Sequence, residues 1–210
     1  YKHLTLIGTS HISKESMVEV EEAILREKPE LVCVELDRKR AYALMHNIKG
    51  RISISDIPRI GVKGYLFALL GGWAEKKMGD YVGVSPGDEM KKAMEVARRE
   101  KTKIAFIDQD IEITLNRLSR ALTWGEKWNF VVDLFKGFVL RQKTYQFDLN
   151  TVPSKELIAK MIGEVKVRYP NLYRVLVEER NVFMAKKLIK IMKDFDGKPL
   201  VAIVGAGHEK

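Results

Sequence analysis

Residues 4–11 read LTLIGTSH, and residues 200–208, near the other end of the chain, read LVAIVGAGH. Each stretch is a short apolar run of strand length that ends in a Gly-x-x-His corner. Such runs are typical of buried strands, and a glycine lets the chain turn sharply where a strand ends. Because the same device occurs twice, we predict one site that is assembled from both ends of the chain around His11 and His208.

The stretches between these two ends predict an α/β fold. Helices are expected over residues 14–27 and 87–100, where apolar residues recur at helical spacing, and buried strands over 31–34 and 104–107. Strands that alternate with helices are typical of a parallel sheet with right-handed crossovers. We therefore expect a central, mostly parallel or mixed sheet flanked by helices, which a last strand at 199–204 completes.

The chain of 210 residues is long enough for one sizeable core, and we predict a single domain, residues 1–210. Residues 123–195 carry helical patterns without strands, so they are expected to form a helical insertion before the last strand. Residues 48–86 contain many glycines. They are compatible both with a lid or interface element and with a plain buried helix.

The charge of the chain is high and basic, with 37 Lys and Arg against 28 Asp and Glu and a formal net charge of +9. These charges are interleaved along the predicted helices and form no basic block, which is typical of solvated helix faces. No nucleic-acid-binding motif accompanies them, so we expect no nucleic-acid partner. The abundance of Lys and Glu favours a heat-adapted source.

The cysteine content and the apolar runs of the sequence bear on disulfides and on membrane spans. Cys33 is the only cysteine, which excludes an intrachain disulfide. No run approaches the roughly 18 apolar residues of a membrane span. The chain begins at Tyr1, not at Met, and it stops two residues after His208. We therefore expect a soluble domain of a protein that can carry a membrane anchor outside these residues, on either side of the membrane.

Four predicted strands each lead to a side chain that can bind a metal or move a proton: His11, Glu35, Asp108 and His208. In an open parallel sheet the ligand crevice lies at the carboxyl ends of the strands, so these side chains can converge. Two histidines with one carboxylate are a common catalytic metal set, and a second carboxylate can serve as general base. The alternative interpretation is that the histidines are hydrogen-bonded structural residues and that the carboxylates cap helices. The sequence is compatible with both interpretations.

A second set of polar residues surrounds Arg180, within the Glu178–Asn181 stretch at a predicted helix start. An arginine can orient a carboxylate or bind a substrate carboxyl group through two parallel hydrogen bonds. A surface ion pair would fit the same spacing. Near the first corner, Ser10 can donate a hydrogen bond at the start of the following helix, where an anion is favoured.

Six motifs follow one another along the chain. They are GTSH at residues 8–11, VELD at 34–37 with Arg38, PGDEM at 86–90, IDQDI at 107–111 with TL at 114–115 and Arg117, ERN at 179–181 with MA at 184–185, and GAGH at 205–208. In this order they resemble the TraB family, which includes the bacterial pheromone-shutdown protein and its archaeal relatives. The resemblance covers essentially the whole chain. One departure is Gln109, where family members frequently have arginine: either a charge is missing there, or this position faces away from the site.

This resemblance implies a fold, a metal and a set of roles. The TraB family is similar to the Tiki metalloproteases and to the erythromycin esterase and ChaN-like folds, which implies a mixed α/β sheet with flanking helices. The Tiki pattern of two Gly-x-x-His motifs and a glutamate implies His11, Glu35 and His208 as metal ligands, with Mn²⁺ or Co²⁺ as the metal and Zn²⁺ as the alternative. Within the matching motifs, catalytic roles are expected for Glu35, Asp108 and Arg180, and substrate contacts for Ser10, Arg38, Glu179 and Asn181.

Two functions follow as hypotheses. The first is a metal-dependent, peptidase-like hydrolase with its site at the strand ends, acting on peptide or amide substrates. The second is a non-enzymatic module that shuts down a pheromone by binding the peptide, in a groove lined by Trp124, Trp128, Tyr145 and Phe147. Archaeal relatives in the TraB family often carry hydrophobic segments after this region, so the resemblance also implies membrane association. An oligomer is compatible with either function.

Overall fold

A computed structural model of the chain describes residues 3–9, 14–48, 55, 57–59, 61, 65, 87–126, 128–129, 132–133 and 163–208. Most of the expected lid region at 48–86, and part of the expected insertion at 123–195, therefore lie outside the described residues. Of the described helices, none is long and apolar enough to cross a membrane. The described residues define the central sheet and the helices on both of its faces.

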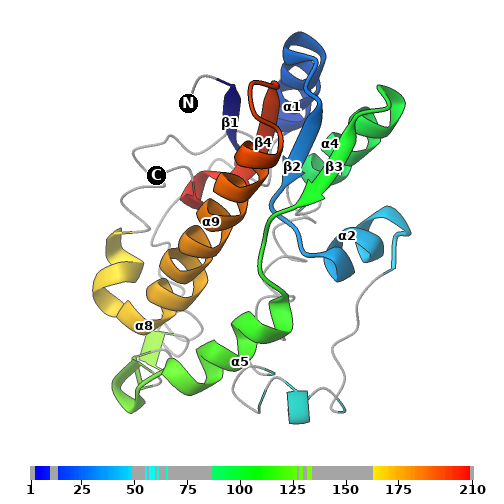
Figure 1. Cartoon of the computed structure of the whole chain (residues 1–210). Coiled ribbons are helices and arrows are strands. Elements are labelled where there is room, and N and C mark those ends of the chain that lie inside the picture. The colour runs from blue at the N-terminus through cyan, green and yellow to red at the C-terminus, as the bar shows by residue number, and fades with distance from the viewer. Residues whose placement is uncertain are drawn as a thin grey trace.

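Four parallel strands form the sheet that the structure describes (Figure 1). Their order is β1-β4-β2-β3, with β1 at Leu4–Thr9, β2 at Leu31–Val34, β3 at Lys103–Phe106 and β4 at Leu200–Gly205. The last strand of the chain therefore lies between the first two. Its register places Gly8 opposite Val204 and Thr9 opposite Gly205, so the two Gly-x-x-His corners begin one residue apart along the sheet. The parallel pairing confirms the predicted α/β class.

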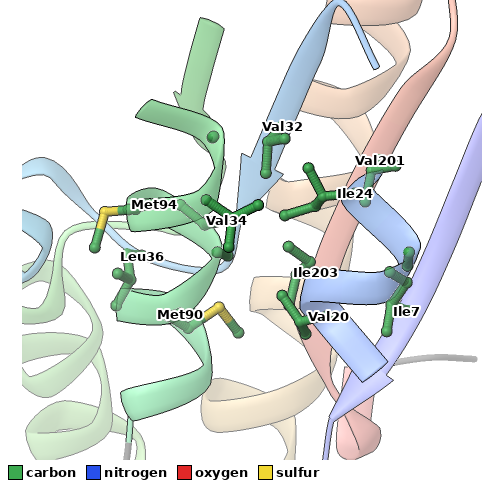
Figure 2. Close-up of a cluster of buried hydrophobic side chains, with 14 of the residues drawn as sticks. Ile7, Val20, Ile24, Val32, Val34, Leu36, Met90, Met94, Val201 and Ile203 are labelled. Carbon is green, nitrogen blue, oxygen red and sulfur yellow. The ribbon is translucent and has the colours of Figure 1, made fainter. Parts of the chain in front are cut away.

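Helices α1 (Lys14–Glu27) and α4 (Asp88–Arg99) cover one face of the sheet. Their apolar side chains pack against the valines and isoleucines of β2 and β4, as Figure 2 shows. Met90 and Met94 of α4 are each 2% exposed, and Ile24 of α1 is 1% exposed. The methionine stripe that the sequence places on α4 is therefore part of the core.

Helix α9 (Glu179–Asp194) covers the opposite face. Its Met184 is buried in one cluster with Cys33, Ala202 and Val204. Along β4, successive side chains therefore alternate between the two helical layers, as a strand buried on both faces requires. Cys33 is fully buried, and burial raises the pKa of its thiol to about 12, so it serves as a small apolar core residue.

Aspartate residues start two of the helices that follow strands. Asp37 caps α2 (Arg38–Met45) and accepts hydrogen bonds from two backbone N–H groups of its first turn, at 2.8 and 2.9 Å. Asp110 caps α5 (Ile111–Ala121) and accepts from one backbone N–H group, that of Glu112, at 2.8 Å. Such caps satisfy donors that the helix itself leaves unpaired.

The described residues before β4 are helical, which confirms the helical segment predicted there. Helix α8 (Pro170–Tyr173) continues into a π-helical turn at Arg174–Glu178, and that turn continues into α9. Short π-helical turns are rare and occur frequently at functional sites. This one directly precedes the first turn of α9, which carries Arg180.

Candidate functional site

Three strand ends and the N-terminal turn of α9 meet at the carboxyl edge of the sheet. Glu35 follows β2, Asp108 follows β3 and His208 ends the short 3₁₀ turn after β4. Hydrogen bonds between neighbouring strands continue past the strand ends, since the backbone N–H of Glu35 donates to the carbonyl of Ile203 at 3.1 Å. The structure thus brings together three of the four strand-end side chains, while His11 lies outside the described residues.

Arg180, in the first turn of α9, contacts all three of these side chains. Its Nε donates to Oδ1 of Asp108 at 3.0 Å, and its Nη2 donates to Oδ2 of Asp108 at 2.6 Å and to Oε1 of Glu35. Its Nη1 donates to the carbonyl of Leu176 at 3.1 Å and contacts Nε2 of His208 at 3.2 Å. A guanidinium group has five N–H donors. Arg180 therefore directs all five at acceptors of its own chain.

Glu35 is held from two sides. Its side chain is 5% exposed, Oε1 accepts from Arg180, and Oε2 accepts from the backbone N–H of Gly205 at 2.6 Å. Gly205 is the first residue of the second Gly-x-x-His corner. That corner therefore does two things: it leads to His208, and its backbone fixes the carboxylate that follows the neighbouring strand.

The contacts of His208 define its tautomer. Its Nδ1 contacts Oδ1 of Asn181, an amide oxygen that can only accept, so Nδ1 carries a proton. Its Nε2 lies 3.2 Å from Nη1 of Arg180, and it accepts a hydrogen bond from that group when the imidazole is neutral. The same Nε2 lies 3.3 Å from Oε1 of Glu35. A neutral His208, the form of histidine that binds metals, places a nitrogen lone pair beside this carboxylate oxygen, whereas a protonated His208 forms an ion pair with it.

Asp108 is deeply buried, with 1% of its side chain exposed. It accepts hydrogen bonds from Arg180, from Nη2 of Arg40 and from the backbone N–H of Gln109. Burial alone would raise the pKa of Asp108, but Arg180, Arg40 and the Gln109 N–H outweigh it and hold that pKa below its usual value. For Arg180, burial alone would lower the pKa, but the carboxylates of Asp108 and Glu35 outweigh this effect and raise the pKa above its usual value. Both groups are therefore charged at neutral pH.

Arg40 and Asp37 join this site without having been predicted as part of it. Arg40, in the first turn of α2, donates to Oδ2 of Asp37 at 2.7 Å and also reaches Asp108. The contact between Asp37 and Arg40 has a signal in the sequence, because an aspartate and an arginine three residues apart can pair at a helix start. The second contact joins residues 68 positions apart, and local spacing does not reveal it.

We call these residues the Arg180 cluster: Glu35, Asp37, Arg40, Asp108, Arg180, Asn181 and His208. It contains three carboxylates and two guanidinium groups, so it carries one excess negative charge when His208 is neutral. Buried charges of this kind are tolerated only when they are paired and hydrogen-bonded. A protonated His208 or an additional cation beside Glu35 balances this excess charge.

The pH dependence of the unfolding free energy tests whether Asp108 is charged in the folded chain. A carboxyl group whose pKa is lower in the folded chain stabilises the fold at neutral pH and loses that contribution as the pH falls through its folded pKa. We expect the difference in unfolding free energy between the wild type and Asp108→Asn to be largest above about pH 5 and to shrink below about pH 4. Urea unfolding at a series of pH values measures this difference, with the exposed Asp194→Asn as the control. A difference that does not change with pH would contradict the assignment.

Two residues of the predicted substrate-binding set lie elsewhere. Arg38 is exposed at the start of α2. Glu179 pairs with Arg117 of α5, with Oε2 and Nε 2.8 Å apart, and it makes no contact described here with the Arg180 cluster. Asn181 does belong to the cluster through His208, and Ser10 lies outside the described residues.

Gln109, the departure from the family pattern, is also accounted for by the structure. Its side chain is buried, and its Nε2 donates to Oγ1 of Thr114 in α5 at 3.1 Å. Of the two alternatives for this position, the structure therefore favours a side chain that faces away from the Arg180 cluster. The cluster contains its own cations in Arg40 and Arg180, so no charge at position 109 is needed to pair Asp108.

The donor atoms of Glu35 and His208 are suited to a divalent metal. Within the part of the chain that the structure describes, no group of three or more His, Cys, Asp or Glu residues is arranged to hold a metal ion. The chemistry of the pair fits nevertheless, since Mn²⁺, Co²⁺ and Zn²⁺ accept carboxylate and imidazole ligands. Asn181 holds the second ring nitrogen of His208, as polar partners of metal-binding histidines commonly do.

The fold and the Arg180 cluster together define a parallel α/β domain with a polar site at the carboxyl edge of its sheet, where such domains bind their ligands. The chain matches the sequence model of the TraB/PrgY/gumN family over residues 2–209, and it belongs to that family. The resemblance inferred from the six motifs is therefore confirmed.

Relatives of the chain occur in archaea and in mammals. An uncharacterised protein of Methanocaldococcus jannaschii is 38% identical over 209 residues, which cover 97% of this chain and 50% of that protein. TraB domain-containing proteins of Bos taurus and Homo sapiens are 26% and 24% identical over 97% of this chain, and the matches cover 59% and 60% of those proteins. The chain thus spans about half of the archaeal relative and about three fifths of the mammalian ones.

Proposed function

We propose that the chain is a metal-dependent hydrolase that cleaves peptide or other amide bonds, with His11, Glu35 and His208 as the metal ligands. The observation that carries this proposal is the pair formed by Oε1 of Glu35 and Nε2 of His208, which lie 3.3 Å apart at the strand ends. Oδ1 of Asn181 contacts Nδ1 of His208, so a neutral ring that donates from Nδ1 to Asn181 has its lone pair on Nε2, where a metal would bind.

The position of β1 supports the inclusion of His11. Strands β1 and β4 are adjacent and parallel, and Thr9 lies opposite Gly205. The chain therefore reaches both Gly-x-x-His corners from neighbouring strands at one edge of the sheet. From this pair of opposite residues, His11 is two residues further along the chain and His208 is three residues further.

The residues of the chain have separate roles in this proposal. A divalent ion held there would lower the pKa of a bound water and polarise the carbonyl group of a substrate. Before a metal binds, the backbone N–H of Gly205 and the guanidinium of Arg180 fix the two oxygens of Glu35. Asp108 binds both Arg40 and Arg180, and in this proposal it is a positioning residue that holds Arg180.

Cleavage of a mixed peptide library tests the proposal. We expect the protein, stripped of metal and reloaded with Mn²⁺ or Co²⁺, to release fragments that mass spectrometry detects, and a chelator to stop the release. His208→Ala is expected to abolish cleavage because it removes the Nε2 lone pair. The matched control is His46→Ala, an exposed histidine at the end of α2, which should cleave like the wild type. Cleavage that survives His208→Ala would contradict the site.

The contact between Asn181 and His208 gives a second prediction. Asn181→Ala is expected to weaken metal binding roughly 10- to 100-fold, because the ring loses the acceptor that fixes its tautomer and orientation. Asn181→Asp keeps an acceptor oxygen at the same position and should retain more affinity than Asn181→Ala. Competition with a metal-binding indicator dye measures all three affinities. Equal affinities of the wild type and Asn181→Ala would show that Asn181 does not support the ligand.

A different observation favours the second candidate function, non-enzymatic peptide binding. The side chains of Trp124 and Trp128 are 83% and 70% exposed, and tryptophan is enriched among the residues that anchor binding partners. Tyr145 and Phe147 of the expected groove lie outside the described residues. This function predicts peptide capture that survives both chelation and His208→Ala and that is lost in the Trp124→Ala/Trp128→Ala double variant. Capture that is unchanged in the double variant would contradict it.

A further inference from the structure

We propose that Arg180 is a built-in counter-cation of this site, and that a divalent ion must displace its guanidinium group from Glu35 and His208 in order to bind. The inference rests on the proposed metal site. It concerns what controls the filling of that site, and it assigns Arg180 a role that differs from the predicted binding of a substrate carboxyl group.

The first step of the argument is that Arg180 contacts the two atoms that a metal would need. Its Nη2 donates to Oε1 of Glu35, and its Nη1 lies 3.2 Å from Nε2 of His208. Oε1 and Nε2 are themselves 3.3 Å apart, so with a neutral His208 a positive group beside them relieves the repulsion between their lone pairs. The guanidinium and a divalent ion therefore serve the same two acceptors.

The second step is that Arg180 remains paired if it releases those two atoms. Its Nε and Nη2 bind the two oxygens of Asp108 at 3.0 and 2.6 Å, and this bidentate contact does not involve Glu35 or His208. Asp108 is in turn held by Arg40. A small rotation of the guanidinium about this anchor would open the pair without leaving a buried charge unpaired, which would be costly.

The third step concerns substrate binding. Because all five N–H donors of Arg180 are directed at acceptors of the chain, the arginine has no donor left for a substrate in this arrangement. Displacement by a metal would release donors from Glu35 and His208. The same event that fills the metal site would therefore make N–H groups of Arg180 accessible at its edge.

Metal affinity in charge-neutral variants tests the competition. We expect Arg180→Gln to bind Mn²⁺ roughly tenfold or more tightly than the wild type, because the competing charge within contact distance is removed. The matched control is Arg40→Gln, which removes a guanidinium from the same cluster but from a residue with no contact to Glu35 or His208. Its affinity should change less. Titration of Mn²⁺, followed by the electron paramagnetic resonance of the free ion, measures the three dissociation constants.

The outcomes separate this inference from the proposed function. Mn²⁺ binding by the wild type with no gain in Arg180→Gln, or with an equal gain in Arg40→Gln, overturns the competition and leaves the metal site standing. No Mn²⁺ binding by any of the three proteins overturns both.

If Arg180→Gln does not fold, the wild type alone provides the test. We expect nitrogen NMR of the arginine side chains to show that Zn²⁺ shifts the Nη resonances of Arg180 while its Nε–H stays protected by Asp108. Unchanged Nη resonances at saturating Zn²⁺ would overturn the inference.

Discussion

Arg180→Gln is expected to lower the free energy of unfolding of the metal-free protein by about 3–5 kcal/mol, the cost of removing one partner from a buried ion pair. The substitution leaves Glu35 and Asp108, whose side chains are 5% and 1% exposed, without the cation that joins them. Arg40 still pairs with Asp108, so Glu35 is the group whose charge loses most of its compensation. Chemical denaturation of the wild type and the variant at neutral pH measures the loss.

The control for this substitution is another arginine that pairs with a glutamate. Arg117 binds Glu179 at 2.8 Å, but 56% of its side chain is exposed. Exposed pairs contribute little because water screens them, so Arg117→Gln is expected to cost less than about 1 kcal/mol. If the two substitutions had equal effects, the Arg180 cluster would not be the buried electrostatic centre described above.

Ile203→Ala is expected to destabilise the fold by about 2–5 kcal/mol. Ile203 is fully buried in the central strand β4, between α1 and α4 on one face of the sheet, and its removal leaves a cavity that rigid neighbours on several elements cannot fill. The substitution also loosens the strand that leads to Gly205 and His208. We therefore expect metal affinity to fall together with stability.

The exposed Ile189→Ala of α9 is the matched control, since 53% of that side chain is in contact with water. Its cost is expected to stay within about 0.5 kcal/mol. Urea unfolding of both variants provides the comparison. An Ile203→Ala protein as stable as Ile189→Ala would show that β4 is not the centre of the core.

The meeting of Glu35, Asp108 and His208 at one edge could be predicted from the sequence, because the carboxyl ends of parallel strands lie at the same edge of a sheet. The apolar runs that end before Glu35, Asp108 and His208 are strands in the structure, and parallel pairing brings their ends to one edge. The order of the strands could not be predicted in the same way. Nothing local in residues 200–205 indicates that this strand inserts between β1 and β2, because pairing partners are chosen by contacts between residues far apart in the sequence.

The details of the site depend on side-chain directions that sequence spacing does not specify. Glu179 and Asn181 lie in the same turn of α9, yet Glu179 pairs with Arg117 whereas Asn181 contacts His208. Arg40 was missed for a related reason, since its partner Asp108 comes from another strand end. The acceptors of Arg180 follow β2, β3 and β4 or lie in the preceding π-helical turn, so local spacing does not reveal its role. The metal-binding, catalytic and substrate-binding roles themselves remain predictions.

The central claim is that histidines from both ends of the chain form one metal site, and a metal count tests it most directly. The purified protein is stripped, reloaded separately with Mn²⁺, Co²⁺ and Zn²⁺, and compared with the His11→Ala/His208→Ala double variant. We predict about one ion per chain in the wild type and none in the folded double variant. A wild type that binds no ion, or a double variant that retains it, would contradict the claim.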